Sequence, residues 1–378
     1  MSIKPISFHN KHTQHFIFST TFMATSTSEA QKYITEAWSS SFDPASLSDA
    51  VLYELCFLLF QQSTTTIGIP SEKLRSFLGL VQAHYLNNPY HCWAHAIHVT
   101  FNAYRLSQNL RDSSTFTDID QFILLFSAVI HDAHHPGHTN MVEIQSNSKL
   151  ARLYNDQSVI ENHSLAIAFD LAQQVQLFSD INETTRTTIR SRTVEMVLAT
   201  DISPPSGKDR ALLMTSKWRN AFGEQVTPET FTIETEEQRQ QIQILLLRMA
   251  DLGSAMQQFS IFGNWSKRLY IENNRSCGLT QEGHTNTQKP FMEYLCVPLV
   301  QEAAKYPILK NIDVIKNLLN ENLKKWNNMD VASKCAAITE AYVAQPEKDE
   351  GRKKEEGDEK GNENGEETGN KNKYVVSE

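Results

Sequence analysis

Residues 70–86 read PSEKLRSFLGLVQAHYL, and their apolar side chains recur with the period of an α-helix. Ser71 precedes the periodic part and is suited to cap its first turn, because a serine hydroxyl can accept a free backbone N–H. The i, i+3, i+4 and i+7 positions of one helix face are occupied by Leu74, Phe77, Leu78 and Val81. The stretch therefore predicts an amphipathic helix with one face in a core.

The same period recurs along most of the chain. SLSDAVLYELCFLLF (46–60) and SVIENHSLAIAFDLAQQ (158–174) both have helical spacing of their apolar residues. No stretch alternates strictly between apolar and polar side chains, and no Asn-Gly or Asp-Gly pair separates two apolar runs, so strand and hairpin signals are missing. The predicted fold class is all-α, with a single large multi-helix domain.

Composition divides the chain into three parts. Residues 1–45 are polar and lack a helical period, so we expect them to be poorly ordered. Residues 46–345 carry the helical patterns and form the predicted folded domain. Residues 346–378 hold 11 acidic and 7 basic side chains and almost no apolar ones, so we expect a charged, disordered tail.

Charge and cysteine usage exclude several classes of protein. The formal net charge of −9 does not provide the positive field that binding a nucleic acid polymer requires. The five cysteines form no CxxC pair, which indicates reduced thiols and a cytoplasmic location. The longest apolar runs are about half as long as a membrane span, so we expect no transmembrane segment.

Histidine is concentrated in one region, since eight of the 13 histidines lie between positions 84 and 138. His91, His95 and His98 have the i, i+4, i+7 spacing of one helix face. Imidazoles buried together lose solvation unless metal ions or carboxylates receive them. This spacing alone is a weak signal, because such pairs are commonly solvent-exposed or hydrogen-bonded.

Two further pieces complete a candidate metal site. His131 and Asp132 end an apolar run and precede a Pro-Gly break, so an imidazole and a carboxylate emerge where the helix stops. Asp251 ends another apolar run, in QILLLRMADLGS (243–254). Together with a histidine of the first cluster they would complete a set of two histidines and two aspartates, which suits zinc or a similar transition ion. Carboxylate oxygens and waters that this first ion does not use suit a magnesium or manganese ion.

These pieces, in this order, resemble the class I 3′,5′-cyclic nucleotide phosphodiesterases, a branch of the His-Asp metal-dependent phosphohydrolases. HDAHHPGHTN (131–140) fits every fixed position of the family pattern His-Asp-x-x-His-Pro-Gly-x-x-Asn. YHCWAH (90–95) fits Tyr-His-Asn-x-x-His except at Cys92. The other matching blocks are YNDQSVIENHSLA (154–166), MVLATD (196–201), ADL (250–252) and TQKPFMEYLCVPL (287–299). The resemblance covers residues 46–345.

The resemblance implies a role for each matching residue. The tighter of two divalent metal sites, a zinc site, would be formed by His95, His131, Asp132 and Asp251. Asp132 would also reach a second ion, magnesium or manganese. Ligands and waters would be oriented by His135, Asn140, Glu161 and Thr200. The substrate would be contacted by Gln288, Phe291, Leu269 and Tyr90.

The implied activity is hydrolysis of 3′,5′-cyclic nucleotides, cAMP, cGMP or both, to 5′-nucleoside monophosphates. A hydroxide bridging the two ions would attack phosphorus, and His91 would act as general acid on the leaving O3′ oxygen. Cys92, Ser254 and the segment 273–288, which looks like a shortened loop across the pocket mouth, depart from the family pattern. They bear on turnover and on the choice between the two nucleotides.

Other functions remain as alternatives. A catalytically weakened relative that binds cyclic nucleotide as a sensor is the main one, because purine-pocket positions such as Ser254 are altered. A His-Asp hydrolase for another phosphate ester is disfavoured by Gln288 and Phe291, which are spaced as a purine clamp. A helical interaction protein would leave the histidine clusters unexplained. The predicted partner is a small cyclic nucleotide, and the sequence leaves formation of a homodimer open.

Overall fold

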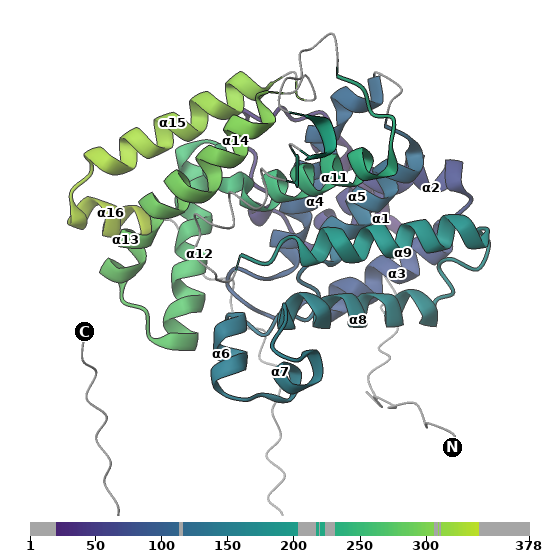
Figure 1. Ribbon diagram of the computed structural model, residues 1–378, viewed down its shortest axis with the longest axis horizontal. Coiled ribbons are helices and arrows are strands. Elements are labelled where there is room, and N and C mark those ends of the chain that lie inside the picture. The colour runs from purple at the N-terminus through teal and green to yellow at the C-terminus, as the bar shows by residue number, and fades with distance from the viewer. Residues whose placement is uncertain are drawn as a thin grey trace, which may run out of the picture. The chain divides into compact units, whose positions relative to one another are not determined.

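The computed structural model describes residues 20–112, 116–202, 217–218, 220–223, 231–305, 309 and 311–339. Within these residues the regular structure is helical and includes no strand, which confirms the predicted all-α fold class (Figure 1). The predicted tail at 346–378 lies outside the described residues.

Helices α2 (Asp49–Ile67) and α3 (Ser71–His84) form where the first two periodic stretches predict helices. The four apolar side chains on the predicted face of α3 are all buried. The N-cap is Pro70 rather than Ser71, because Ser71 is already the first helical residue, and Pro70 offers no side-chain hydrogen bond.

The segment before residue 46 differs from its expected disorder. Helix α1 (Thr20–Tyr33) contacts α2, and Ala30 is buried in the core. Residues 1–19 lie outside the described part of the chain. The apolar side chains that attach residues 33–42 to the core are Tyr33, Ile34, Trp38 and Phe42. They lack a helical period in the sequence, which is why pattern alone does not reveal their packing.

Three mutually contacting helices form the centre of the domain: α4 (Trp93–Asp112), α5 (Asp118–Ile130) and α11 (Glu236–Asp251). A capping box at Thr117 starts α5, and one at Thr235 starts α11, so the first turns of both helices have their N–H groups satisfied. Both helices end at a predicted metal ligand.

A buried ionic network joins α5 and α11 to α9 (Glu183–Leu198). The Asp120 carboxylate accepts from Arg192 Nη2 at 2.7 Å and from Arg239 Nη1 at 3.0 Å. Gln243 Nε2 donates to the Asp120 carbonyl at 2.8 Å. A buried charge held this fully is costly to disrupt, since removing one partner leaves the others unpaired. The network fixes the relative positions of the two helices that end at predicted metal ligands.

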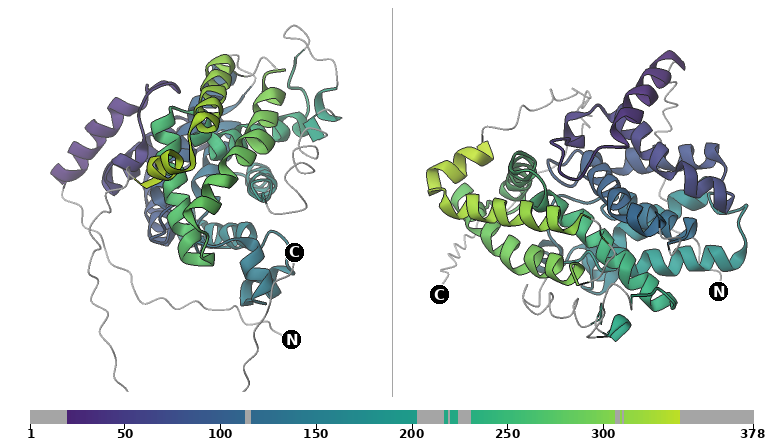
Figure 2. Two further views of the ribbon diagram at one scale, coloured as in Figure 1. Left: turned by 90° about the vertical axis from the view of Figure 1, so that its left-hand side faces the viewer. Right: turned by 90° about the horizontal axis from the view of Figure 1, so that it is seen from above.

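The remaining helices pack around this centre, with α12 to α16 on one side and α1 to α3, α8 and α9 on the other (Figures 1 and 2). The remaining elements are η1 (Pro44–Ser46), α6 (Asn140–Gln145), α7 (Lys149–Tyr154), α8 (Val159–Gln174), η2 (Leu252–Met256), α12 (Phe259–Cys277), α13 (Gln281–Phe291), the π-helical η3 (Met292–Cys296), α14 (Val297–Ala303), α15 (Ile312–Asn328) and α16 (Val331–Thr339).

No helix in the described ranges combines the length and apolar character that a membrane span would need.

The segment 273–288, which we expected to be a loop, is mostly helical. Helix α12 continues to Cys277 and is ended by Gly278, whose φ of 69° lies in the left-handed region that glycine tolerates. Thr280 then caps α13 by accepting the Gly283 N–H at 3.0 Å. Only residues 278–280 connect the two helices.

Candidate metal centre

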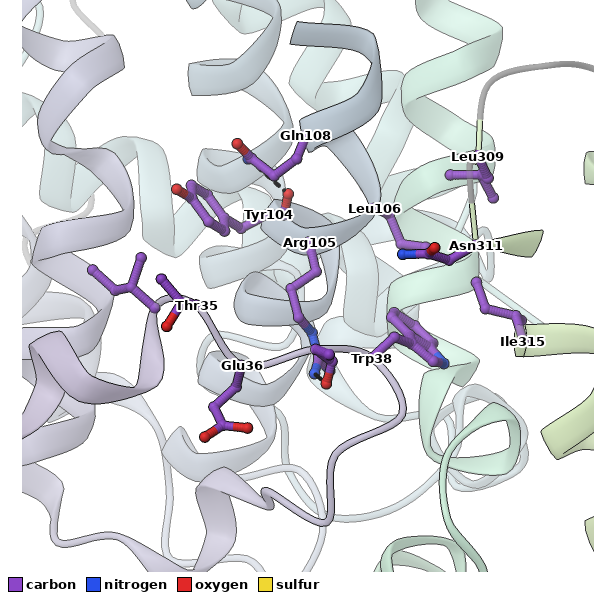
Figure 3. A pocket seen from close by; sticks show the side chains of 12 residues that line it. Thr35, Glu36, Trp38, Tyr104, Arg105, Leu106, Gln108, Leu309, Asn311 and Ile315 are labelled. Atoms are coloured by element: carbon purple, nitrogen blue, oxygen red, sulfur yellow. Dashed lines mark hydrogen bonds between the residues drawn. The ribbon is translucent and has the colours of Figure 1, made fainter. Parts of the chain in front are cut away.

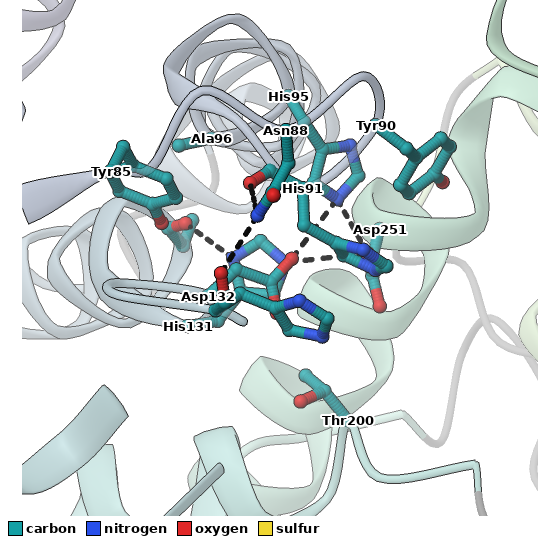
Figure 4. Close-up of polar contacts among 12 residues, drawn as sticks. Tyr85, Asn88, Tyr90, His91, His95, Ala96, His131, Asp132, Thr200 and Asp251 are labelled. Atoms are coloured by element: carbon teal, nitrogen blue, oxygen red, sulfur yellow. Dashed lines mark hydrogen bonds and ion pairs between the residues drawn. The ribbon is translucent and has the colours of Figure 1, made fainter. Parts of the chain in front are cut away.

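Three helices bring the four predicted metal ligands together (Figure 4). His95 lies in the first turn of α4, His131 and Asp132 directly follow α5, and Asp251 is the last residue of α11. His95 Nε2 is 3.5 Å from Asp132 Oδ2 and 3.4 Å from Asp251 Oδ1. His131 Nε2 is 3.1 Å and 3.4 Å from the same two oxygens. Two imidazole nitrogens therefore face two carboxylate oxygens across a common centre.

The hydrogen bonding of these histidines fits a divalent cation. Both side chains are only 2% exposed, yet their Nε2 atoms form no hydrogen bond with any described residue. A buried polar nitrogen without a partner is unfavourable. His131 Nδ1 lies 2.8 Å from the Ala128 carbonyl and so carries a proton, which leaves Nε2 as the atom that would ligate a cation at the centre. Imidazole and carboxylate donors of this kind suit zinc.

The charges of the cluster attract cations. Although burial opposes ionisation, His131 holds the pKa of Asp132 well below its usual range, and His131 and His95 do the same for Asp251. Burial lowers the pKa of His131, but the Asp132 and Asp251 carboxylates outweigh burial and raise that pKa well above its usual value. The two carboxylates thus favour a positive charge in the cluster. A divalent cation would neutralise more of their negative charge than one proton on His131 does.

His91 precedes His95 by four residues, and a buried carboxylate orients it. Glu272 Oε1 contacts His91 Nδ1, while Glu272 Oε2 accepts the backbone N–H groups of Tyr90 at 2.9 Å and of His91 at 3.0 Å. Burial lowers the pKa of His91, but Glu272 and Asp132 outweigh it and raise that pKa above its usual value. Because Nδ1 is engaged, Nε2 is the nitrogen available to donate a proton.

His135 braces the His91 ring. The two rings stack with their centroids 3.7 Å apart and an angle of 19° between their planes. Gly137 N–H donates to His135 Nδ1 at 3.0 Å, and burial together with the neighbouring His91 lowers the pKa of His135 to about 3. Asn88 Nδ2 donates to the carbonyls of both His91 and His135, at 3.1 and 2.7 Å, so the two backbone segments are tied together.

The other predicted orienting residues lie on α6, on α8 and just after α9. Asn140 Nδ2 donates to Glu161 Oε2 at 2.9 Å. Burial and the Asp201 carboxylate raise the pKa of Glu161 to about 7. Thr200 donates its hydroxyl to the Val197 carbonyl at 2.7 Å and lies below the ligand cluster in Figure 4.

The predicted purine contacts lie on the neighbouring helices α12 and α13. Gln288 is buried, and its Nε2 is 3.2 Å from His284 Nε2, which in turn lies 3.1 Å from Ser266 Oγ of α12. Phe291, three residues further along α13, packs partly buried against the core. These contacts hold the Gln288 amide in one orientation.

Helix α12 links these residues to the metal ligands. The Tyr90 ring lies 4.6 Å from the His95 ring and 5.6 Å from the Trp265 ring of α12. Leu269, one turn after Trp265, is half-buried on the same helix. Tyr90 therefore contacts the helix that carries Leu269.

The turn that follows Asp251 is supported from the opposite side. Asn102 Nδ2 donates to the Ala250 carbonyl at 3.2 Å, and Trp38 Nε1 donates to the Met256 carbonyl at 2.8 Å. A Cβ at Gly253 would lie 2.7 Å from Asn102 Nδ2, so the close approach of helix and turn requires glycine here.

Arg105 completes this support. Its Nη2 contacts Asn102 Oδ1, its Nη1 donates to the Ala37 carbonyl at 2.9 Å, and its guanidinium lies 5.0 Å from the Trp38 ring. Arg105 and Trp38 line a cavity of about 400 Å³ between residues 34–38, α4 and α15 (Figure 3). The N-terminal segment thus takes part in positioning the end of α11.

Sequence reasoning missed two residues that orient the site, Glu272 and Asn88. Glu272 is 181 residues from His91, so no local spacing connects them. The one available signal is that Glu272 follows Leu269 by three residues and shares its helix face. Asn88 acts on backbone carbonyls, and such contacts leave no pattern in the sequence.

Known proteins include clear relatives of this chain. The family model for 3′,5′-cyclic nucleotide phosphodiesterase matches residues 90–316, more than half of the chain. The chain belongs to this family. It is 30% identical over 267 residues to mouse 3′,5′-cyclic-AMP phosphodiesterase 4C, covering 66% of this chain and 38% of the relative. It is 26% identical over 325 residues to the Dictyostelium discoideum 3′,5′-cyclic-nucleotide phosphodiesterase regA, covering 81% and 39%.

The chain therefore spans less than half the length of either curated relative. Among solved structures, it is similar to the phosphodiesterase domain of Salpingoeca rosetta rhodopsin phosphodiesterase, with a TM-score of 0.68 and 26% identity. That match covers 79% of this chain and 93% of the solved domain. The similarity to a nearly complete phosphodiesterase domain supports the single-domain fold.

Proposed function

We propose that this chain hydrolyses 3′,5′-cyclic nucleotides, cAMP, cGMP or both, to 5′-nucleoside monophosphates in a metal-dependent reaction. Family membership supports the reaction class, and both curated relatives are named as cyclic nucleotide phosphodiesterases. The observation that carries the proposal is a four-ligand cluster, with contacts of 3.1 to 3.5 Å, beside a histidine that a buried carboxylate orients.

The metal ligands divide between two sites. The tighter site, which we assign to zinc from its two imidazole and two carboxylate donors, would be formed by His95, His131, Asp132 and Asp251. Asp132 would also reach a second ion, magnesium or manganese. When bound, such ions offset the charge of the phosphodiester and make water acidic enough to act as a nucleophile at neutral pH. Waters and ligands would be oriented by His135, Asn140, Glu161 and Thr200.

His91 would protonate the leaving group. Cleavage of the P–O3′ bond leaves an alkoxide, a strong base that takes a proton as it departs. His91 would give that proton from Nε2, because Glu272 engages Nδ1 and its negative charge stabilises the imidazolium beforehand. After the transfer, the neutral ring retains its contact with Glu272. General acid help of this kind typically contributes 10² to 10⁴ in rate.

The substrate's base would be bound between α12 and α13. Gln288 would hydrogen-bond the purine edge and Phe291 would stack on one face, with Leu269 on the other. Tyr90 would lie close to the phosphate end, since it packs against His95. The contact of Gln288 with His284 supports this role because it limits rotation of the amide before substrate binds.

An assay of both nucleotides tests the proposal. Purified protein with Mg²⁺ or Mn²⁺ is expected to convert cAMP, cGMP or both to the 5′-monophosphate, with product formation followed by chromatography and abolished by a chelator. His91→Ala should lower turnover at least about 10²-fold and keep its metal content. Asp251→Asn should lose metal, whereas Asp313→Asn, the same change at an exposed carboxylate on α15, should behave as wild type.

Metal-loaded protein that binds a cyclic nucleotide without turnover would contradict the proposal and favour a sensor. Loss of metal from His91→Ala but not from Asp251→Asn would overturn the assignment of roles.

A further inference from the structure

The cavity between residues 34–38, α4 and α15 contains a positive charge that no described carboxylate neutralises. Its volume is about 400 Å³, which is in the range of cavities that bind small molecules. The Arg105 side chain extends into it from α4 (Figure 3). Among the described residues, no carboxylate forms an ion pair with this guanidinium. None of the predicted site residues lines the cavity, so it is separate from the metal centre.

The hydrogen bonds of Arg105 are incomplete within the described part of the chain. Nη1 donates to the Ala37 carbonyl at 2.9 Å and Nη2 contacts Asn102 Oδ1, whereas the buried Nε–H has no partner there. A guanidinium has more N–H donors than these contacts use. Burial lowers the pKa of Arg105, and Glu36 offsets this effect only in part. A half-buried cation with spare donors favours an anionic acceptor beside it.

Apolar side chains adjoin the guanidinium inside the cavity. Trp38, Leu106 and Ile315 line it and are buried, and the Trp38 ring lies 5.0 Å from the guanidinium. Glu36 is the one acidic residue among the described lining residues. In Figure 3 the Glu36 carboxylate lies to the left of the guanidinium and the Trp38 ring to its right. The cation and the apolar residues therefore meet on the side away from Glu36.

We propose that this cavity binds a small organic carboxylate with a flat apolar body, of the arylalkanoate class. The carboxylate would accept from the spare Nη donors of Arg105, whose planar group suits a carboxylate. The apolar body would pack against Trp38 and Leu106. The ligand would thus bridge residues 34–38 and α4. The proposal does not depend on the proposed hydrolysis, because the cavity shares no residue with the metal centre.

Titration calorimetry with three probes tests the site. Full-length, metal-loaded protein would be titrated with 3-phenylpropanoate, with 3-phenylpropanamide, which keeps the body without the charge, and with acetate, which keeps the charge without the body. We expect 3-phenylpropanoate to bind at least about tenfold more tightly than either of the others, because only it uses both the cation and the apolar wall. Equal affinity for the amide, or no binding of 3-phenylpropanoate, would overturn the proposal.

A charge variant tests the role of Arg105 while leaving Arg105 and its structural contacts in place. Glu36→Gln removes the negative charge that competes for the guanidinium, so its affinity for 3-phenylpropanoate should rise about threefold or more. Glu29→Gln, the same change on α1 at a residue that does not line the cavity, should bind as wild type. Affinity that is unchanged or lower in Glu36→Gln would contradict binding through Arg105.

A second variant tests the location of the bound probe. Thr35 is exposed and lines the cavity, so Thr35→Trp should fill it and abolish binding without disturbing the core. Thr65→Trp, at an exposed threonine of α2 away from the cavity, is the matched control and should keep wild-type affinity. Full binding to Thr35→Trp would place the probe elsewhere, such as at the bound metals, and would overturn the proposal.

Discussion

At the scale of single residues, we expect the contact between Glu272 and His91 to control proton transfer. The carboxylate engages Nδ1 of the ring and two backbone N–H groups at once, so it fixes the position of His91 and, against the opposing effect of burial, helps to raise the pKa of His91. Glu272→Gln keeps the size of the side chain but removes its charge. We expect kcat to fall about 10²-fold with metal content unchanged, as measured by steady-state kinetics and elemental analysis.

Glu282→Gln, the same substitution at an exposed position in the first turn of α13, serves as the control and should retain wild-type kcat. A Glu272→Gln enzyme with full kcat would show that His91 needs no carboxylate partner.

His98 is a residue whose titration affects stability. Its ring stacks on Trp265 at 5.0 Å, and its Nε2 is 2.7 Å from Gln257 Oε1. Burial lowers the pKa of His98 from 6.5 to about 4. Between pH 4 and pH 6.5 the His98 side chain is more protonated in the unfolded chain than in the folded one. The stabilisation that comes from neutral His98 is therefore present at neutral pH and is lost as the pH falls from about 6.5 toward 4.

The expected loss of unfolding free energy from His98 is about 2 kcal/mol between pH 7.5 and pH 5. His98→Gln keeps a donor for Gln257 but cannot titrate, so its free energy of unfolding should fall correspondingly less over this range. Urea unfolding at both pH values measures the difference. Equal acid sensitivity of the two proteins would be inconsistent with a depressed His98 pKa.

At the scale of elements, the site depends on where helices end. Asp251 reaches the predicted metal site because α11 stops there, and the η2 turn that follows can approach α4 closely because position 253 is glycine. Gly253→Ala would place a Cβ 2.7 Å from Asn102 Nδ2 and 3.3 Å from Trp38, which forces the turn outward. We expect about a tenfold loss of affinity for the first metal, measured by titration against a competing chelator.

Gly79→Ala in α3 is the matched control, since a Cβ there meets nothing within 4 Å. It should keep wild-type metal affinity and gain about 0.5–1 kcal/mol of stability, because alanine favours a helix interior. Wild-type affinity in Gly253→Ala would mean that the turn does not position Asp251.

Patterns in the sequence predict elements well where local rules determine them. The α3 stripe from Leu74 to Val81 and the positions of the predicted ligands at the ends of α5 and α11 follow from periodicity and from helix-stop signals. The segment 273–288 was wrongly expected to be a loop, although Gly278 and Thr280 are ordinary helix-end signals that could have divided it.

At the scale of the whole molecule, the all-α class could be predicted, but contacts between distant segments could not. Trp38 reaches Met256 over 218 positions, and Glu272 reaches His91 over 181. Such contacts depend on how the helices pack, which periodicity does not encode. The packing of residues 20–45 was unexpected for the same reason. The roles of the metal-ligand, orienting, general-acid and purine-pocket residues all remain predictions.

The central claim is that one pocket, built from α4, α5 and α11, binds divalent cations through four side chains. Anomalous difference density, recorded at the zinc edge from crystals of the full chain, tests this claim most directly. The account predicts a peak coordinated by His95, His131, Asp132 and Asp251. Folded protein whose map contains no peak at that position, even with zinc bound elsewhere, would contradict it.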